Sequence, residues 1–257
     1  MARLGSSHLL LLLALAIVVL GKGLGYPAYA APLSQPDKGS LEFSGYRWLV
    51  ISQEEKRGPG PTVFDARNVS LDTEGRLVLE TRRISGRWTS AHVFLSESLG
   101  YGSYEIRLAA QEFPLDKRAV FGFFTWDDDP AFANREIDIE LARWNSSANA
   151  NLHYNVQPSE GRPERGSSFE FDFSSPVTLR FDWLPGSVSF SAVSERESFQ
   201  WTFSDMGAQA KPFGVPPKGN EKLGLNLWLF RGLSPKAPSR IIVERFEFTP
   251  ASMEGLR

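Results

Sequence analysis

Acidic and aliphatic residues alternate strictly along the run Glu136-Ile137-Asp138-Ile139-Glu140, and this run constrains the fold more than any other stretch of the chain. A two-residue period is that of a β-strand, in which the three carboxylates share one face and the two isoleucines share the other. A helix would place Glu136 and Glu140 as a repelling pair at i, i+4, and β-branched isoleucines favour strands. The run therefore predicts a strand with three acids on one face.

Two interpretations of these acids stay open from the pattern alone. In an ordinary antiparallel sheet they would form the solvated face of a half-buried strand. Against this interpretation, the three acids repel one another with no basic residue among them, and Trp126 and Trp144 lie nearby in the sequence. Carboxylates beside flat aromatic rings are what a sugar-binding cleft needs, so the run is also a candidate catalytic site.

Residues 1–30 have the pattern of a secretory signal peptide. Arg3 supplies a short basic start, the residues from Leu9 to Leu20 are an unbroken apolar run, and Ala28-Tyr29-Ala30 is a small-x-small cleavage site. The apolar run is shorter than the roughly 20 residues of a transmembrane helix. We expect cleavage after Ala30, secretion to an extracellular or periplasmic location, and a mature chain that is not attached to a membrane.

The rest of the chain, roughly 227 residues, suits a single all-β domain. We predict a mobile, proline-containing leader over residues 31–40 and one domain over residues 41–257. Short alternating segments separated by turn residues such as Pro185-Gly186, with no convincing amphipathic helix, predict a sandwich or a barrel. Besides the acidic strand, the predicted strands are 46–52, 76–82, 89–95, 104–109, 120–126, 151–157, 168–173, 178–183, 188–193, 199–203, 223–230 and 241–248.

Composition and missing motifs narrow the chemistry. The net charge of −2 becomes −4 when Arg3 and Lys22 leave with the signal, so a nucleic-acid partner is not expected. The chain has no cysteine, which excludes a disulfide framework, thiol catalysis and thiolate-bound zinc. It also has no Gly-x-Ser-x-Gly, phosphate-binding loop or His-Glu-x-x-His motif. His92 and His153 are interpreted as structural residues, and carboxylate chemistry remains.

Two carboxyl groups on one strand can cleave a glycosidic bond by double displacement, one as nucleophile and the other as proton donor. Retention of configuration requires the two groups to be about 5 to 5.5 Å apart. The Cα atoms of Glu136 and Glu140 would be roughly 13 Å apart on an extended strand, so their long side chains would have to lean together on a curved sheet. Asp138 between them would hydrogen-bond one or both and raise at least one pKa.

The acidic run resembles the E-x-D-x-E signature of glycoside hydrolase family 16. The likeness covers about residues 41–250 in the expected order, and it also rests on GYGSYE at 100–105, GFFTW at 122–126, FDWLPG at 181–186 and NLW at 226–228. The resemblance implies a concanavalin-like β-jelly-roll sandwich of two antiparallel sheets with a concave substrate cleft. The spacing of the acids resembles the lichenase and xyloglucan-transglycosylase branch more than the laminarinase and agarase branch.

The same resemblance implies roles for single residues. Glu136 would be the nucleophile, Glu140 the general acid/base and Asp138 the assisting acid. The implied substrate-binding residues are Trp126, Trp144 and Trp228 as sugar platforms and Tyr154, Asn155 and Asn226 as hydrogen-bonding groups. No metal or other cofactor is expected. Many family members hold a structural calcium on the convex side through an acidic residue in the last strand, for which Glu244 is the candidate here. We interpret Glu244 as a solvated acid, and Asp127-Asp128-Asp129 as a solvated turn.

We therefore expect a secreted, monomeric O-glycosyl hydrolase that cleaves internal β-linkages of a polysaccharide with retention, a β-glucan being the first candidate. A catalytically silent carbohydrate-binding jelly-roll module, a transglycosylase on the same scaffold and an adhesion domain that binds no carbohydrate stay open as alternatives. The presence of all three acids argues against the binding module, because a pure binder does not need a cluster of like charges. A hydrolase and a transglycosylase share the glycosyl-enzyme and differ in what attacks it.

Overall fold

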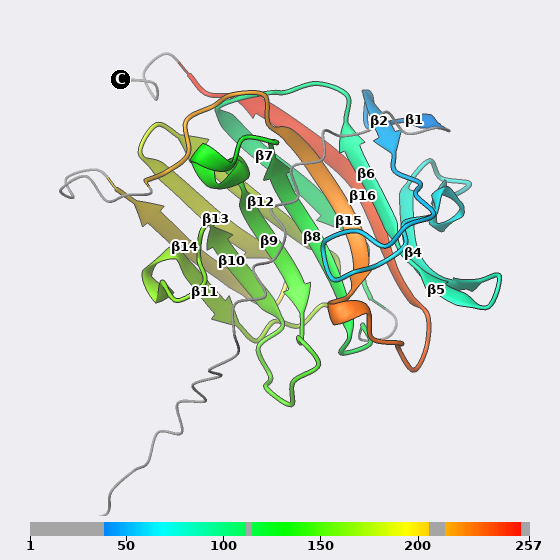
Figure 1. The fold of residues 1–257 in the computed structure, drawn as a ribbon. Coiled ribbons are helices and arrows are strands. Elements are labelled where there is room, and N and C mark those ends of the chain that lie inside the picture. Colours follow the sequence, from blue (N-terminus) through cyan, green and yellow to red (C-terminus); the bar gives the residue numbers. More distant parts are fainter. Residues whose placement is uncertain (1–38, 112–114, 206–213, 253–257) are drawn as a thin grey trace, which may run out of the picture.

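Alternating apolar and polar residues build two antiparallel sheets that pack face to face in the computed structural model, which describes residues 39–111, 115–205 and 214–252 (Figure 1). Each sheet has eight strands. The predicted signal peptide and nearly all of the predicted leader lie outside the described residues. The all-β jelly-roll sandwich expected from the sequence is confirmed.

We call the sheet that contains the acidic strand the front sheet. Its strands, in spatial order, are β1 (Ser40–Phe43), β2 (Tyr46–Val50), β6 (Ala91–Leu95), β15 (Lys222–Leu229), β8 (Ala119–Trp126), β9 (Ile137–Ala142), β10 (Leu152–Val156) and β11 (Gly166–Phe169).

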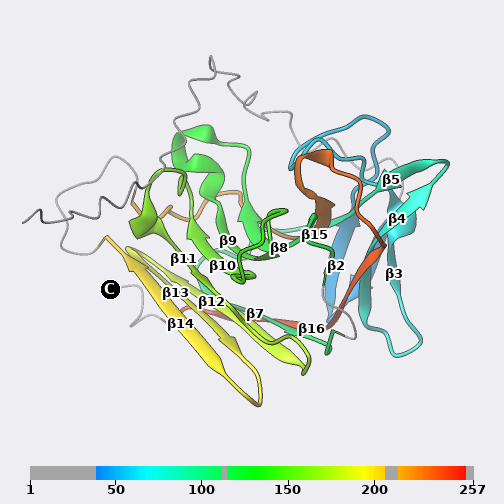
Figure 2. The same ribbon diagram turned by 90° about the horizontal axis from the view of Figure 1, so that it is seen from below.

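The other sheet is the back sheet, and Figure 2 shows its strands β12, β13 and β14 in a layer separate from β9, β10 and β11. Its strands, in spatial order, are β14 (Ser198–Ser204), β13 (Ser187–Val193), β12 (Val177–Leu184), β7 (Gly102–Leu108), β16 (Ser239–Pro250), β4 (Leu77–Ile84) and β3 (Val69–Leu71), with β5 (Arg87–Thr89) beside β4.

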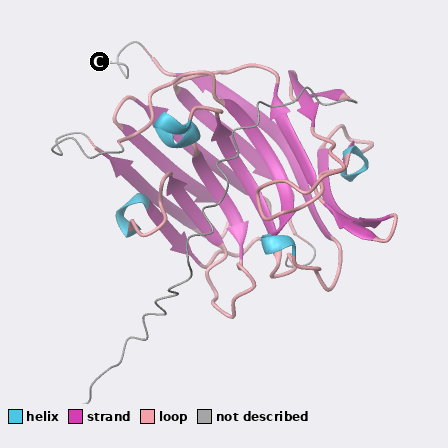
Figure 3. Cartoon of the chain, in the orientation of Figure 1, coloured by secondary structure: helices cyan, strands magenta, loops and turns pink. Residues whose placement is uncertain are grey.

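Helical structure within the described ranges is limited to short 3₁₀ segments in the connections (Figure 3). None of the helices in this part of the chain is long and apolar enough to cross a membrane. The four segments are η1 (Ala66–Asn68), η2 (Pro130–Arg135), η3 (Pro163–Arg165) and η4 (Phe230–Gly232).

Every predicted strand is present, most of them within one or two residues of the predicted ends. Three short strands, β1, β3 and β5, were missed because three or four residues are too few to show a period. The bounds predicted as 168–173 are wrong, since the strand at this place, β11, spans Gly166–Phe169. Beyond it, Phe171 turns into the core and Asp172 accepts a hydrogen bond from the backbone N–H of Ser174 at 2.8 Å, which forms a turn.

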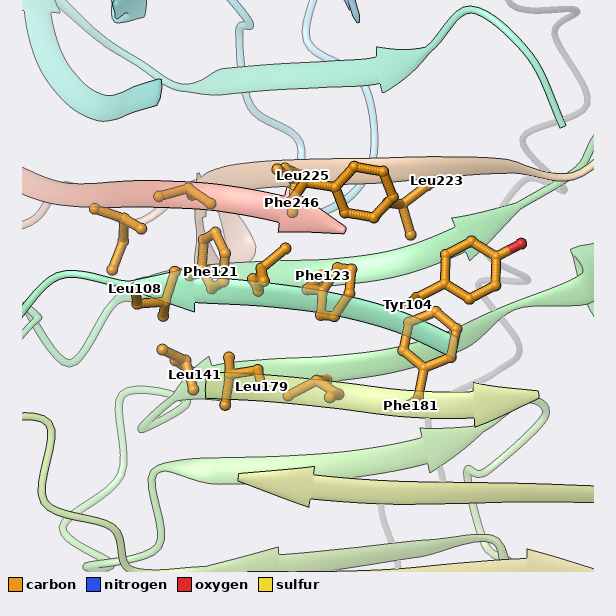
Figure 4. Packing of buried hydrophobic residues seen from close by; sticks show 14 of the residues in the cluster. Tyr104, Leu108, Phe121, Phe123, Leu141, Leu179, Phe181, Leu223, Leu225 and Phe246 are labelled. Atoms are coloured by element: carbon orange, nitrogen blue, oxygen red, sulfur yellow. The ribbon is translucent and has the colours of Figure 1, made fainter. Parts of the chain in front are cut away.

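The core lies between the two sheets and takes one face of each strand. In β9 the residues Ile137, Ile139 and Leu141 point inward, as do Leu152, Tyr154 and Val156 in β10. Because side chains alternate along a strand, the residues between them point to the outer face of the front sheet. Figure 4 shows part of this core, formed by Tyr104, Leu108, Phe121, Phe123, Leu141, Leu179, Phe181, Leu223, Leu225 and Phe246.

Candidate active site

The three acids lie together on the outer face of the front sheet, as their alternation predicted. Asp138 and Glu140 belong to β9, and Glu136 immediately precedes that strand. Ile137 and Ile139 are fully buried in the core and so fix the outward direction of the acids between them. The backbone carbonyl of Glu136 accepts a hydrogen bond of 3.0 Å from Gln157, which continues the pairing between β9 and β10.

A cavity of about 680 Å³ runs along this outer face. This volume lies within the range of roughly 300 to 1,000 Å³ that small-molecule sites occupy in proteins. Its walls come from the front sheet, from residues 51–64 and from η4, and the connection through residues 51–64 is drawn in blue in Figure 1. Of the residues predicted for the site, the cavity is lined by Trp126, Glu136, Asp138, Glu140, Asn226 and Trp228.

Strand register connects the acids to the other side of the cavity. Glu140 lies beside Gly122 of β8, Gly122 beside Asn226 of β15, and Asn226 beside His92 of β6. Adjacent strands are about 4.8 Å apart, so Asn226 lies about 10 Å from Glu140 across the sheet. A Cβ atom on Gly122 would lie 2.6 Å from Oδ1 of Asn226. Because glycine has no side chain, this position leaves room for the Asn226 side chain on the floor of the cavity.

Two amide side chains hold the central acid. Asn155 donates from Nδ2 to Oδ1 of Asp138 at 2.6 Å, and Gln157 donates from Nε2 to Oδ2 at 3.0 Å. Burial raises the pKa of Asp138 to about 6, although these two hydrogen bonds favour its ionised form and act in the opposite direction. The two amides therefore fix the orientation of Asp138 between the glutamates.

Burial also raises the pKa of Glu136 and the pKa of Glu140 well above their ordinary value. The negative charge of Asp138 is the next cause for both groups, and for Glu140 the charge of Glu136 adds to it. Three carboxylates at such close quarters do not all ionise freely. The cluster can therefore hold a proton near neutral pH, which is the condition for a carboxylic acid that donates a proton to a leaving group.

The connection that precedes Glu136 is held by a buried ion pair. Nη1 of Arg135 lies 2.7 Å from Oδ2 of Asp127, and the two residues are only 8% and 6% exposed. The interpretation of 127–129 as a solvated turn is thus wrong for Asp127, because the guanidinium of Arg135 turns back toward it. This path needs left-handed backbone at Ala133, Asn134 and Arg135, with φ of 50°, 58° and 49°.

Further contacts of Arg135 tie this connection to β8 and to the segment before β15. Its Nε donates to the carbonyl of Pro217 at 3.0 Å, and its carbonyl accepts a hydrogen bond of 2.7 Å from Oγ1 of Thr125. The same hydroxyl oxygen accepts from the backbone N–H of Ile137 at 3.1 Å. The residues on both sides of Glu136 are therefore held in place, which fixes the backbone from which the Glu136 side chain extends.

The three tryptophans predicted as sugar platforms differ in their surroundings. Trp126 is half-buried on the cavity wall, whereas Trp228 is 7% exposed because Gly60 packs against its ring. A Cβ atom on Gly60 would lie 2.3 Å from Cζ3 of Trp228. Trp144 is half-buried against Trp228 and His153, with ring centroids 6.2 and 5.5 Å away, and it is not part of the described cavity lining.

Tyr154 was predicted to hydrogen-bond a sugar, and this prediction is wrong. Its ring is buried in the core against Phe190, and its hydroxyl donates to the carbonyl of Phe199 at 3.3 Å. The reason is the period of β10, which gives Tyr154 the inward direction of Leu152 and Val156. Asn155 points outward, but its amide binds Asp138 and it does not line the cavity, so it acts on the acid cluster.

Three residues of the site were not identified from the sequence alone. Gln157 binds Asp138, and its place could have been found, because 153, 155 and 157 alternate onto the face opposite Tyr154. Gln53 and His92 line the cavity on the side away from the acids. Nothing in the local pattern marks Gln53, while His92 follows the outward period of β6.

No cluster of three or more His, Cys, Asp or Glu side chains that could hold a metal ion occurs in the described ranges. Glu244, where a structural calcium was considered, accepts a hydrogen bond of 2.9 Å from Nε of Arg107 and is paired with that residue. The expectation that the site works without a cofactor stays a prediction.

Comparison with solved structures shows the same fold in polysaccharide-degrading enzymes. A Bacillus licheniformis β-glucanase superposes with a TM-score of 0.61 at 18% identity, covering 84% of this chain and 100% of that one. A laminarinase from Rhodothermus marinus gives 0.61 at 18%, covering 79% and 90%. A glycoside hydrolase family 16 endo-glucanase from Bacteroides ovatus gives 0.57 at 15%, covering 79% and 94%.

No protein-family sequence profile and no curated protein sequence matches the chain. The likeness is therefore one of structure, at identities where sequence comparison finds nothing, and it extends over about four fifths of the chain. The protein has the β-jelly-roll fold of solved β-glucanases and laminarinases, among them an endo-glucanase of glycoside hydrolase family 16.

Proposed function

We propose that this protein is a secreted member of glycoside hydrolase family 16 that cleaves internal β-linkages of a polysaccharide with retention of configuration. The observation that carries the proposal is the cluster of Glu136, Asp138 and Glu140 on the floor of a large cavity, with the pKa of all three raised by burial. Raised carboxyl pKa values in a cleft are typical of acid/base catalysis and are unfavourable for a merely structural surface.

In the first step, a carboxylate oxygen of Glu136 attacks the anomeric carbon while Glu140 donates its proton to the glycosidic oxygen, so the C–O bond breaks and a glycosyl-enzyme ester forms. In the second step, Glu140 takes a proton from water, whose oxygen attacks the same carbon and releases Glu136. Asp138, held by Asn155 and Gln157, keeps its place beside both glutamates. Two inversions at one carbon give overall retention.

The structural neighbours support a β-glucan as the first substrate class to test, since they include a β-glucanase, a lichenase and a laminarinase. Two of the neighbours were solved with glucan-type ligands. Secretion by the predicted signal peptide and a monomeric state are part of the proposal. The intact mass of the secreted protein would test the cleavage after Ala30, because a mass that includes Met1 would contradict it.

Release of reducing ends from a panel of β-glucans, xyloglucan, agars and carrageenans would test the activity. The mature wild type is compared with Glu136→Gln, which keeps the size of the side chain and removes the nucleophile. We expect release by the wild type alone, and product sizes with and without added sugar acceptor would separate hydrolysis from transglycosylation. If neither protein releases ends from any polymer while both are folded and bind one, the protein is a binding module.

A further inference from the structure

One side of the cavity holds buried polar atoms that have no hydrogen-bond partner among the described residues. These atoms are Oε1 of Gln53, Nε2 of His92 and Oδ1 of Asn226, and all three residues line the cavity. His92 is 7% exposed and Asn226 is 3% exposed. Buried polar atoms in native proteins almost always have a hydrogen-bond partner in protein, water or ligand, so these three atoms are available to a molecule bound in the cavity.

The wall around these atoms is aromatic. The ring of His92 lies 4.9 Å from that of Phe64, 4.4 Å from that of Phe94 and 5.8 Å from that of Phe124, measured between centroids. Phe94 and Phe124 meet edge to face over Gly224, where a Cβ atom would lie 2.5 Å from Cζ of Phe124. This part of the cavity therefore combines a few polar atoms with a predominantly apolar surface.

We propose that this pocket, formed by Ile51, Phe64, His92, Phe94 and Asn226, binds the acetamido group of an N-acetylated amino sugar in the substrate chain. An acetamido group has one N–H donor, one carbonyl acceptor and one methyl group. Its N–H would donate to Oδ1 of Asn226, and its carbonyl oxygen would accept from Nε2–H of His92. Its methyl group would pack against the phenylalanine rings.

The protonation state of His92 agrees with this arrangement. Burial lowers the pKa of His92 to about 3, so the imidazole is neutral at working pH and carries a single N–H. A neutral ring can donate one hydrogen bond to a carbonyl without bringing a charge into the apolar wall. A cation at this place would instead favour an anionic group on the sugar.

A plain hexose fits this pocket less well. Each of its hydroxyls is both a donor and an acceptor, and a buried hydroxyl against the rings of Phe64, Phe94 and Phe124 would lose partners that it has in water. A methyl group at the same place loses nothing and gains apolar contact. The chemistry of the pocket therefore distinguishes an acetamido substituent from a hydroxyl.

The inference rests on the proposed function and narrows its substrate class. Asn226 lies two strands from Glu140, about 10 Å away, so the amino sugar would occupy a subsite close to the bond that is cleaved. The preferred polymer would then be a β-linked chain that contains N-acetylhexosamine, in place of an unsubstituted glucan.

Binding to the Glu136→Gln variant tests the inference separately from catalysis. The probes are a β-1,4-linked tetramer of N-acetylglucosamine and the matched tetramer of glucose, which differ only at the 2-substituent. By calorimetry we expect the acetamido tetramer to bind about tenfold more tightly. By NMR we expect the proton signal of one acetamido methyl group to move upfield, because the faces of the surrounding rings shield it.

Two further variants in the same background locate the contact. Asn226→Ala should weaken binding of the acetamido tetramer more than binding of the glucose tetramer, and so remove most of the preference. Phe94→Leu should reduce the upfield shift of the methyl signal. Leu71→Ala, at an exposed position on β3, is the control that should alter neither result.

Equal or tighter binding of the glucose tetramer, or an acetamido methyl signal that stays at its free position, would overturn the inference. The outcome is independent of the proposed activity. If the wild type cleaves plain β-glucans and the glucose tetramer binds as well, the function stands and the pocket assignment is wrong. If no polymer is cleaved but the acetamido tetramer binds with the shifted methyl signal, the pocket stands and the enzymatic proposal fails.

Discussion

Replacing Asp127 with alanine should destabilise the protein and also damage catalysis, because this carboxylate holds the connection that leads to Glu136. Asp127 pairs with Arg135 at 2.7 Å and accepts backbone hydrogen bonds from Asp129 at 2.6 Å and Asn220 at 3.1 Å. The substitution would leave the guanidinium of Arg135 buried without this partner. Removing one member of a buried ion pair costs about 3 to 5 kcal/mol of unfolding free energy.

For a domain of this size, 1 kcal/mol corresponds to about 2 to 4 °C in melting temperature, so we expect Tm to fall by about 6 to 20 °C. Arg135 directly precedes Glu136, and a displacement of about 1 Å at a reacting group can lower the rate about 100-fold. We therefore expect a decrease of this order in kcat/KM at temperatures where the variant is still folded.

The matched control is Asp129→Ala in the same connection. Asp129 lies 3.5 Å from Arg135, but its side chain is 42% exposed, and it also accepts a capping hydrogen bond from Ala131 at 3.0 Å. Losing an exposed pair and a cap costs about 1 kcal/mol, or about 2 to 4 °C in Tm. Thermal unfolding and initial rates of both variants check the expectation. The reasoning is refuted if Asp127→Ala unfolds no earlier than Asp129→Ala, or if it keeps the wild-type kcat/KM.

Three further predictions concern the site and its neighbours. The pKa of Asp138 in the folded protein, about 6, exceeds its ordinary value of 3.8. Between these two pH values the folded state binds more protons than the unfolded state, so the Tm of the wild type should fall as pH rises. Asp138→Asn should make this fall between pH 4 and 7 smaller, and an unchanged fall would contradict the prediction. Tyr154→Phe removes the hydrogen bond to Phe199 and should lower the free energy of unfolding by about 1 kcal/mol, while kcat/KM stays at the wild-type value. An inactive variant would instead show that Tyr154 acts in the site. Gly122→Ala should displace the Asn226 amide, because the new Cβ atom would lie 2.6 Å from its Oδ1. Kinetics should then show KM raised about tenfold, and thermal unfolding should show little change in Tm.

The fold was predictable from the sequence because it follows from the two-residue alternation of apolar and polar residues along the strands. The alternation at 136–140 places Glu136, Asp138 and Glu140 outward, and the structure has them so. The same rule, applied to β10, would have shown that Tyr154 points inward and that Gln157 shares the face of Asn155. The resemblance implies a sugar contact for Tyr154, whereas the period of β10 directs this side chain into the core.

The rest of the site depends on contacts between residues far apart in the sequence. From the sequence, the acids at 127–129 are interpreted as a solvated turn. In the structure, three left-handed residues bring the guanidinium of Arg135 back to the carboxylate of Asp127. Trp228 is expected to be an open sugar platform, but in the structure Gly60 packs against its ring. No local sequence pattern predicts these two contacts, because each joins residues that meet only when the connections between strands fold over the sheet.

The most direct test of the central claim is the configuration of the first product. The polymer that gives the largest release of reducing ends is incubated with the mature wild type in an NMR tube, and the anomeric proton of the new reducing end is followed before mutarotation. Double displacement through Glu136 predicts that the β-anomer appears first and the α-anomer grows in later. Initial appearance of the α-anomer would contradict the mechanism and the roles of Glu136 and Glu140.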